Sequence, residues 1–329
     1  MTSDTTTFRM GPSQALPDVI RSLGVDPLPI LRAAGLDVRL FDHAENRIDM
    51  RVLGHLFHLA VCSTRREDIG LLLAQHFGIE KLGLLGLIMA EGPDVRTALR
   101  NLCRLLHHNN RAAMLSLIVA DRDATLKYDL RHADFEGVSV ILDSVVAMMM
   151  RSMQRLCGPE WVPHEVHLSR RRPRDVRPYA SYFRAPLRFN SVQDAIVFPL
   201  ADLDRPVPRG QIAKATDPAS PPRPVEDRVR FFLTTAMGLE DMSLPALARS
   251  FGVSSRTVNR MLAREDTSFQ LILDDVRSTR ARHLLSRGDA PLAEIAVALG
   301  FGDASVFTRS FRRWTGSSPS AWRRQHRSV

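Results

Sequence analysis

The 329-residue chain contains little cysteine. Cys62, Cys103 and Cys157 are an odd number and include no C-x-x-C pair, so the sequence indicates neither a disulfide framework nor a zinc cluster. We expect these residues to be buried thiols.

Long hydrophobic runs are also absent. No segment reaches the roughly 18 uninterrupted apolar residues that a membrane span needs, and the polar segment 1–12 has no apolar core of a secretory signal. The sequence therefore predicts no membrane partner and a cytoplasmic location. With 44% hydrophobic and 25% charged residues, the composition is that of a globular protein, and the length favours two domains.

The motifs of common enzyme classes are missing as well. No G-x-S-x-G, P-loop, H-E-x-x-H or G-x-G-x-x-G pattern occurs, so we predict that the chain is not an enzyme. His55 and His58 share a helix face and His107 is followed by His108, but no carboxylate or cysteine accompanies them at a consistent spacing. We therefore predict no metal and no cofactor.

Lysine is scarce, and arginine carries nearly all of the cationic charge. The formal net charge of +9 favours a polyanionic partner. Arginine suits bidentate contacts to phosphates and guanines, although a codon-composition bias produces the same enrichment.

Proline is concentrated at 217–225, where it occupies four of nine positions. Such a run cannot continue a helix or a central strand, and it predicts a semi-rigid linker. We therefore expect an N-terminal domain at 1–210, a linker at 211–225 and a C-terminal domain at 226–329. The C-terminal domain has 16 arginines against 11 acidic residues, so it is more basic per residue than the rest.

The C-terminal domain contains an internal repeat, in which residues 243–253 align with residues 291–301. Apolar residues at i, i+3 and i+7 form one helix face, a small alanine lets a second helix cross closely, and a glycine after the helix can take a positive φ. The matching pairs are Leu244 with Leu292, Leu247 with Ile295, Ala248 with Ala296, Phe251 with Leu299, and Gly252 with Gly300.

A second helix follows the glycine turn in each copy, at 255–262 and at 304–311. Each has a buried i, i+4 apolar pair, which fixes the opposite face as the exposed one. One such hairpin is common in helical proteins, but two matched copies predict two helix-turn-helix units, at about 243–264 and 291–314, that bind double-stranded DNA. The exposed faces carry Arg256, Asn259 and Arg260 in the first unit, and Ser305, Thr308 and Arg309 in the second.

A long helix is predicted between the units, at 268–285, because this segment has neither glycine nor proline. Its 18 or so residues make a rod of roughly 27 Å, which would hold the units apart so that one chain reads two neighbouring groove segments. After the second unit, Gly316 ends a helix, and Ser318 and Pro319 begin another whose N-terminus can bind a phosphate. The nearby cations are Arg312, Arg313, Arg323 and Arg324, for which a solvated face is the alternative.

Four short patterns carry a family resemblance. Residues 280–285 (RARHLL), I-A-x-x-x-G-F at 295–301, F-x-R-x-F at 307–311 and G-x-S-P at 316–319 resemble the AraC/XylS family of bacterial transcription regulators, over about residues 241–324. Trp322 replaces a tyrosine that is frequent there but keeps an aromatic anchor, and Asp303 is expected to cap a helix rather than to contact cytosine.

The resemblance implies a transcription regulator, and RNA polymerase and a second copy of the chain are the further partners that we expect from it. It implies base contacts from Arg256, Asn259, Arg260, Ser305 and Arg309. We expect phosphate contacts from Thr257, Thr308, Arg312, Arg313 and Ser318.

The N-terminal domain mixes helical and strand patterns and is expected to be α+β. Helical periodicity occurs at 52–60, 95–106 and 138–156; strands are predicted at 112–120 and 124–130, joined as a hairpin, and at 195–198. The order of these segments, over about residues 16–208, resembles the effector-binding domain of one branch of AraC-like regulators. That resemblance implies control by a small-molecule effector of unknown identity and unknown binding residues.

Several alternatives remain open in this domain. The run Met148 to Met150 with Met153 forms a buried core or dimer helix, or else lines an apolar ligand site. The arginines at 170–172 and 174 form a solvated loop or contact nucleic acid. The domain as a whole serves effector binding, or only dimerisation or binding of a partner protein. An enzyme fused to a DNA-binding domain, such as a DNA-repair transferase that uses a cysteine, is the third function considered.

Overall fold

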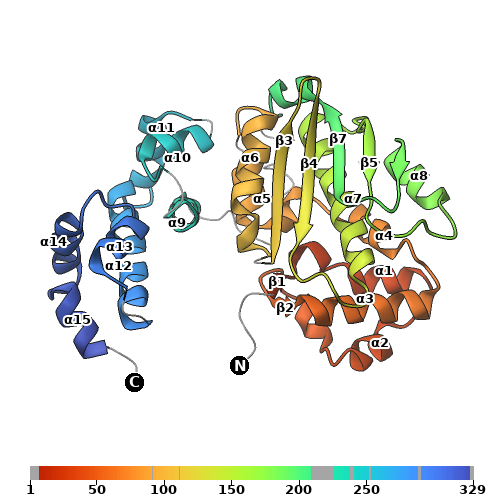
Figure 1. Cartoon of the computed structure of the whole chain (residues 1–329), viewed down its shortest axis with the longest axis horizontal. Helices are drawn as coiled ribbons and strands as arrows, with labels where there is room; N and C mark the ends of the chain where they lie inside the picture. The colour runs from red at the N-terminus through yellow and green to blue at the C-terminus, as the bar shows by residue number, and fades with distance from the viewer. Residues whose placement is uncertain are drawn as a thin grey trace. The chain divides into compact units, whose positions relative to one another are not determined.

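The computed structural model describes residues 7–90, 92–110, 112–208, 225–237, 241–251, 253–287 and 290–326. The chain forms two compact units, 1–220 and 221–329. The predicted linker at 211–225 lies outside the described residues except for its last residue. Figure 1 shows a first unit with a sheet and helices, and a second unit made of helices, as the sequence predicts.

A five-stranded sheet organises the first unit. Its strand order is β3-β4-β7-β5-β6, and all pairs are antiparallel except the parallel pair β5 and β6. The predicted hairpin and the predicted strand at 195–198 are confirmed as β3, β4 and β7. The parallel pair was not predicted. The bounds are β3 Ala113–Val119, β4 Asp123–Leu130, β5 Glu165–His167, β6 Leu187–Arg188 and β7 Asp194–Pro199.

Helix α7 (Val138–Cys157) packs on one face of this sheet, against β4 and β7, and also contacts α3 and α4. In Figure 1 it runs behind the strands, and α1, α2 and α3 gather beyond one end of the sheet. The three predicted helices are confirmed as α3, α6 and α7. The other bounds are β1 Thr7–Arg9, α1 Leu16–Ser22, α2 Pro27–Ala33, β2 Arg47–Asp49, α3 Met50–Thr64, α4 Ile69–Gln75, α5 Leu84–Ala90, α6 Val95–Leu105 and α8 Arg177–Phe183, with 3-10 helices at Gly11–Ser13, Val38–Phe41, Ile79–Leu82, Leu106–His108 and Leu200–Asp204.

A buried ion pair fastens α7 to the segment before α8. Asp143 on α7 is 1% exposed, and its Oδ2 lies 2.5 Å from Nη1 of Arg170 and accepts a hydrogen bond from the Tyr179 hydroxyl at 2.8 Å. Burial raises the pKa of Asp143 to about 7, against the opposing effect of Arg170 and Tyr179. The prediction of a solvated arginine loop is therefore wrong for Arg170, whose side chain is 10% exposed.

In the described part of the second unit, the two predicted helix-turn-helix units are accompanied by three further helices. The predicted connecting helix is confirmed as α12, and it extends two residues beyond the predicted end. None of the described helices of the chain is long and apolar enough to cross a membrane. The bounds are α9 Val225–Ala236, α10 Leu244–Ser250, α11 Ser255–Ala263, α12 Phe269–Arg287, α13 Leu292–Ala298, α14 Ala304–Thr315 and α15 Pro319–His326.

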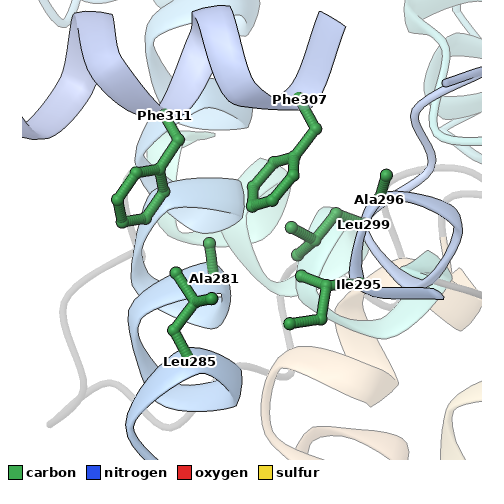
Figure 2. Packing of buried hydrophobic residues seen from close by; sticks show 7 residues of the cluster. All are labelled: Ala281, Leu285, Ile295, Ala296, Leu299, Phe307 and Phe311. Carbon is green, nitrogen blue, oxygen red and sulfur yellow. The ribbon is translucent and has the colours of Figure 1, made fainter. Parts of the chain in front are cut away.

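Helix α12 packs against α14 of the second helix-turn-helix unit and against α15. It also packs against α9, which in turn contacts α11 of the first helix-turn-helix unit. Figure 2 shows the second core, in which Phe307 and Phe311 point from α14 toward α12 and α13. The ring of Trp322 packs edge-on against Phe311, with centroids 6.0 Å apart, so the predicted aromatic anchor is confirmed. This core consists of Ala281, Leu285, Ile295, Ala296, Leu299, Phe307 and Phe311.

Candidate nucleic-acid interface

Helix α11 presents the predicted polar face of the first helix-turn-helix unit. It begins at a serine cap, where Ser254 Oγ accepts a hydrogen bond from the Thr257 backbone N–H at 3.2 Å. Val258 and Leu262 are fully buried, as predicted, and they orient the helix. The opposite face is therefore open to solvent, and the exposed side chains on it are Arg256, Asn259 and Arg260.

Helix α14 presents the corresponding face of the second helix-turn-helix unit. Asp303 caps it by accepting hydrogen bonds from the backbone N–H groups of Ser305 and Val306 at 2.6 and 2.9 Å, which confirms the capping role. These backbone bonds, that of Val306 first, lower the pKa of Asp303. Ser305 and Arg309 lie exposed, one helical turn apart, opposite the buried phenylalanines.

The predicted phosphate-contacting residues lie in different local settings. Arg312 is exposed, whereas Arg313 Nη2 lies 2.7 Å from Oδ2 of Asp274 on α12. The Thr308 hydroxyl donates to the backbone oxygen of residue 304, four positions earlier in its own helix. Ser318 caps α15 by accepting from a backbone N–H, and the Thr257 hydroxyl lies 3.0 Å from that of the α11 cap.

The turn of the second helix-turn-helix unit is held by an arginine that the sequence patterns did not single out. Arg277 on α12 donates from Nε to the Leu299 backbone oxygen and from Nη2 to that of Gly300, both at 3.0 Å. Its guanidinium also lies 4.4 Å from the ring centroid of Phe301. Gly300 has the predicted positive φ, +72°. Arg277 therefore fixes the turn that aims α14.

The first helix-turn-helix unit has a counterpart to this contact. Arg228 on α9 lies 4.8 Å from the ring centroid of Phe251, and burial lowers its pKa to about 10. Glu265, just after α11, accepts hydrogen bonds from the first two backbone N–H groups of α9 at 2.7 and 2.8 Å. Arg228 and Arg277 precede their turn glycines by nearly the same number of residues, a signal that could have found both. Gly252 itself lies outside the described residues.

The first unit of the chain contains a cavity of about 70 Å³. It lies between α7, the β3–β4 hairpin, α3 and the end of α6, and 19 residues line it. Met148 and Met149 belong to this lining, whereas Met150 and Met153 are buried and do not. The methionine run thus serves both the core and a cavity wall.

The cysteines depart from the prediction. Cys62 is exposed, so the expectation of a buried thiol is wrong there. Cys103 and Cys157 are partly buried, and burial raises the pKa of both thiols to about 12. Cys103 packs near the backbone of β3 rather than beside a base.

The paired histidines of α3 meet a carboxylate that the sequence spacing did not reveal. His55 Nδ1 contacts Oε1 of Glu136, and His58 Nε2 lies 3.7 Å from its Oε2. Even so, within the described ranges no three histidine, cysteine or acidic side chains are arranged to hold a metal ion.

Comparison with known families matches both units. Residues 24–207 match the arabinose-binding domain of AraC transcription regulator, N-terminal, and residues 247–325 match a helix-turn-helix domain. The sequence is 26% identical over 322 residues to the ornithine utilization regulator of Pseudomonas aeruginosa, covering 94% of each chain. It is 23% identical over 319 residues to the transcriptional regulator VirS of Mycobacterium tuberculosis, covering 93% of each.

Among solved structures, the chain is similar to that of the transcriptional regulator CdpR from Pseudomonas aeruginosa. It is 22% identical, with a TM-score of 0.43, and the match covers 91% of this chain and 96% of that one. The relatives named here are transcription regulators rather than enzymes. The matched N-terminal domain spans more than half of the chain, and the helix-turn-helix match covers all of the second predicted helix-turn-helix unit and most of the first. The chain belongs to the AraC family of transcription regulators, with an N-terminal ligand domain and a C-terminal DNA-binding domain.

Proposed function

We propose that one chain binds two neighbouring major-groove segments of double-stranded DNA, one with α11 and one with α14. The observation that supports this is the pair of exposed polar faces, each opposite a buried apolar pair on a short capped helix. A helix that is polar on its outer face and fixed by its inner face can enter the major groove without unfolding. Helix α12 has 19 residues, about 28 Å at 1.5 Å each, and it packs against α9, which contacts α11, and against α14.

Sequence reading is assigned to the longest polar side chains of these faces. Arginine pairs with guanine through two hydrogen bonds, and asparagine pairs with adenine in the same manner. Arg256, Arg260 and Arg309 therefore favour guanine, Asn259 favours adenine, and Ser305 accepts more than one base. Each good bidentate pair discriminates by about 1–3 kcal/mol against the wrong base.

Backbone contacts fix the register of the two helices on the duplex. The residues with this proposed role are Thr257, Thr308, Arg312, Arg313 and Ser318. The guanidinium of Arg313, a residue of α14, pairs with Asp274 on α12 at 2.7 Å, and its remaining N–H groups are the ones proposed to contact a phosphate. Ser318 lies at the start of α15, where the backbone N–H groups favour an anion.

Control by a small molecule is the proposed role of the first unit, with RNA polymerase and a second copy of the chain as further partners. The match to a ligand-binding domain supports this role. If the domain served only dimerisation, heating the protein with candidate metabolites would show no stabilisation, because a ligand raises the melting temperature only when it binds the folded state.

The test is selection of bound duplexes from a random DNA library by three variants of the full chain. Arg260→Ala and Arg309→Ala should each lose base preference at one or two positions, at opposite ends of the selected site. Arg100→Ala removes an exposed arginine of α6 and should leave the selected site unchanged. Uniform weakening for all sequences by Arg309→Ala would remove its base-reading role.

A further inference from the structure

The cavity in the first unit has a lining without charge. None of its 19 lining residues is an aspartate, glutamate, lysine, arginine or histidine. An ionised ligand placed there would lose its hydration without gaining a counter-charge, which is strongly unfavourable. The lining chemistry therefore disfavours amino acids, carboxylates and amines as ligands of this cavity.

Most polar groups of the lining are already engaged within the protein. The Ser144 and Ser152 hydroxyls donate to backbone oxygens of their own helix at 2.6 and 2.9 Å. The Asn109 side-chain amide donates to the Leu82 backbone oxygen at 3.2 Å. A sugar needs a partner for each of its hydroxyl groups, and few groups remain free to supply one.

Tyr128 provides one such free group. Its buried hydroxyl accepts a hydrogen bond from the Asn110 side-chain amide at 3.0 Å and donates none to the described residues. Burial raises the pKa of Tyr128, so the hydroxyl keeps its proton and can donate it. Ser13 contributes a second hydroxyl to the lining.

The rest of the lining is apolar and adaptable. Phe57, Phe77 and Leu115 supply rigid walls, and Met148 and Met149 supply thioether side chains that fit irregular shapes. The present volume of about 70 Å³ accommodates only a small molecule. Rotation of the methionine side chains is the simplest way to enlarge it.

We propose that this cavity is the effector site and that its ligand is a small, uncharged, mainly apolar molecule with one oxygen that accepts a hydrogen bond from Tyr128. A ketone or an alcohol has this chemistry. The inference rests on the proposed effector control of the first unit.

The experiment measures binding of cyclohexanone and benzyl alcohol, with arabinose and ornithine as polar comparisons, to the full chain by calorimetry and by ligand-observed NMR. Ser152→Leu fills the cavity and should weaken binding of the neutral probes at least about tenfold. Tyr128→Phe removes one hydrogen bond and should weaken it about threefold to tenfold. Tyr182→Phe removes a hydroxyl outside the cavity, which donates to a backbone oxygen at 3.3 Å, and should leave binding unchanged.

Two results would overturn the inference: neutral probes whose binding is absent or insensitive to both cavity variants, or arabinose or ornithine binding that Ser152→Leu abolishes. Melting curves of the variants separate lost binding from lost folding. DNA binding is measured in parallel without probe. If DNA binds and the neutral probes do not, the ligand class is wrong; if the probes bind but leave DNA binding and transcription unchanged, the proposed effector control is wrong.

Discussion

Replacing Arg277 by alanine should loosen the turn of the second helix-turn-helix unit while leaving the first helix-turn-helix unit intact. The guanidinium donates to two backbone oxygens at the end of α13 and lies over the Phe301 ring. These oxygens belong to Leu299 and Gly300, which directly follow the last residue of α13, so no further turn of that helix supplies a backbone N–H group for them. The substitution removes all three contacts at once.

The magnitude follows from these contacts. A hydrogen bond to a charged group contributes about 1.5–3 kcal/mol when it is well buried, and a cation–π contact about 0.5–1 kcal/mol at exposed sites. Arg277 is half-buried, so water partly replaces the lost bonds. We expect a loss of about 2 kcal/mol in local stability, which corresponds to a roughly 30-fold faster amide exchange.

The assay is hydrogen–deuterium exchange of the full chain, followed at the amides of residues 299–301. Arg280→Ala is the matched control, since Arg280 is an exposed arginine of the same helix. Exchange in α10 and α11 should stay unchanged in both variants. Unchanged exchange at the turn in Arg277→Ala, or an equal increase in both helix-turn-helix units, would refute the bracing role.

Three further predictions concern the N-terminal unit, residues 1–220. Gly137→Ala should destabilise it by about 1–3 kcal/mol more than Gly35→Ala in urea unfolding, because both glycines have positive φ but only a Cβ at residue 137 would clash with backbone, at 2.0 Å; equal losses would contradict the close approach. Arg170→Met should cost about 3–5 kcal/mol at pH 8 and less at pH 5. Burial raises the pKa of Asp143 to about 7 even with Arg170 present, so at pH 8 the variant must either bury an unpaired carboxylate or keep a proton that the unfolded chain releases, whereas at pH 5 the carboxyl is already protonated; a pH-independent loss would rule this out. A maleimide at pH 8 should label Cys62 first, since the other two thiols have pKa values raised to about 12, and Cys62→Ser should remove the fast phase.

The helix-turn-helix repeat of residues 221–329 was predictable because it depends on spacings between residues that are close in the sequence. Spacings of three, four and seven residues determine which side chains share a helix face, and they correctly separated the buried Val258 and Phe307 from the exposed Arg256 and Arg309. The cap at Asp303 was predictable for the same reason, since a capping side chain bonds only to its nearest residues.

Contacts between distant segments were not predictable from spacing. Arg277 reaches carbonyl groups 22 and 23 residues away, and the Asp143–Arg170 pair spans 27 residues. A run of arginines has the composition of a solvated loop whether or not one of them is buried, so the sequence did not reveal that Arg170 is buried beside Asp143. The cavity likewise depends on the packing of helices and strands that no single segment encodes.

The most direct test of two reading helices in one chain is a methylation-interference map on the selected DNA site, combined with the mass of the complex. We predict two contacted major-groove segments for each bound chain, with centres about one helical turn, roughly 34 Å, apart. One contacted segment for each bound chain would contradict the proposal that α11 and α14 both read bases.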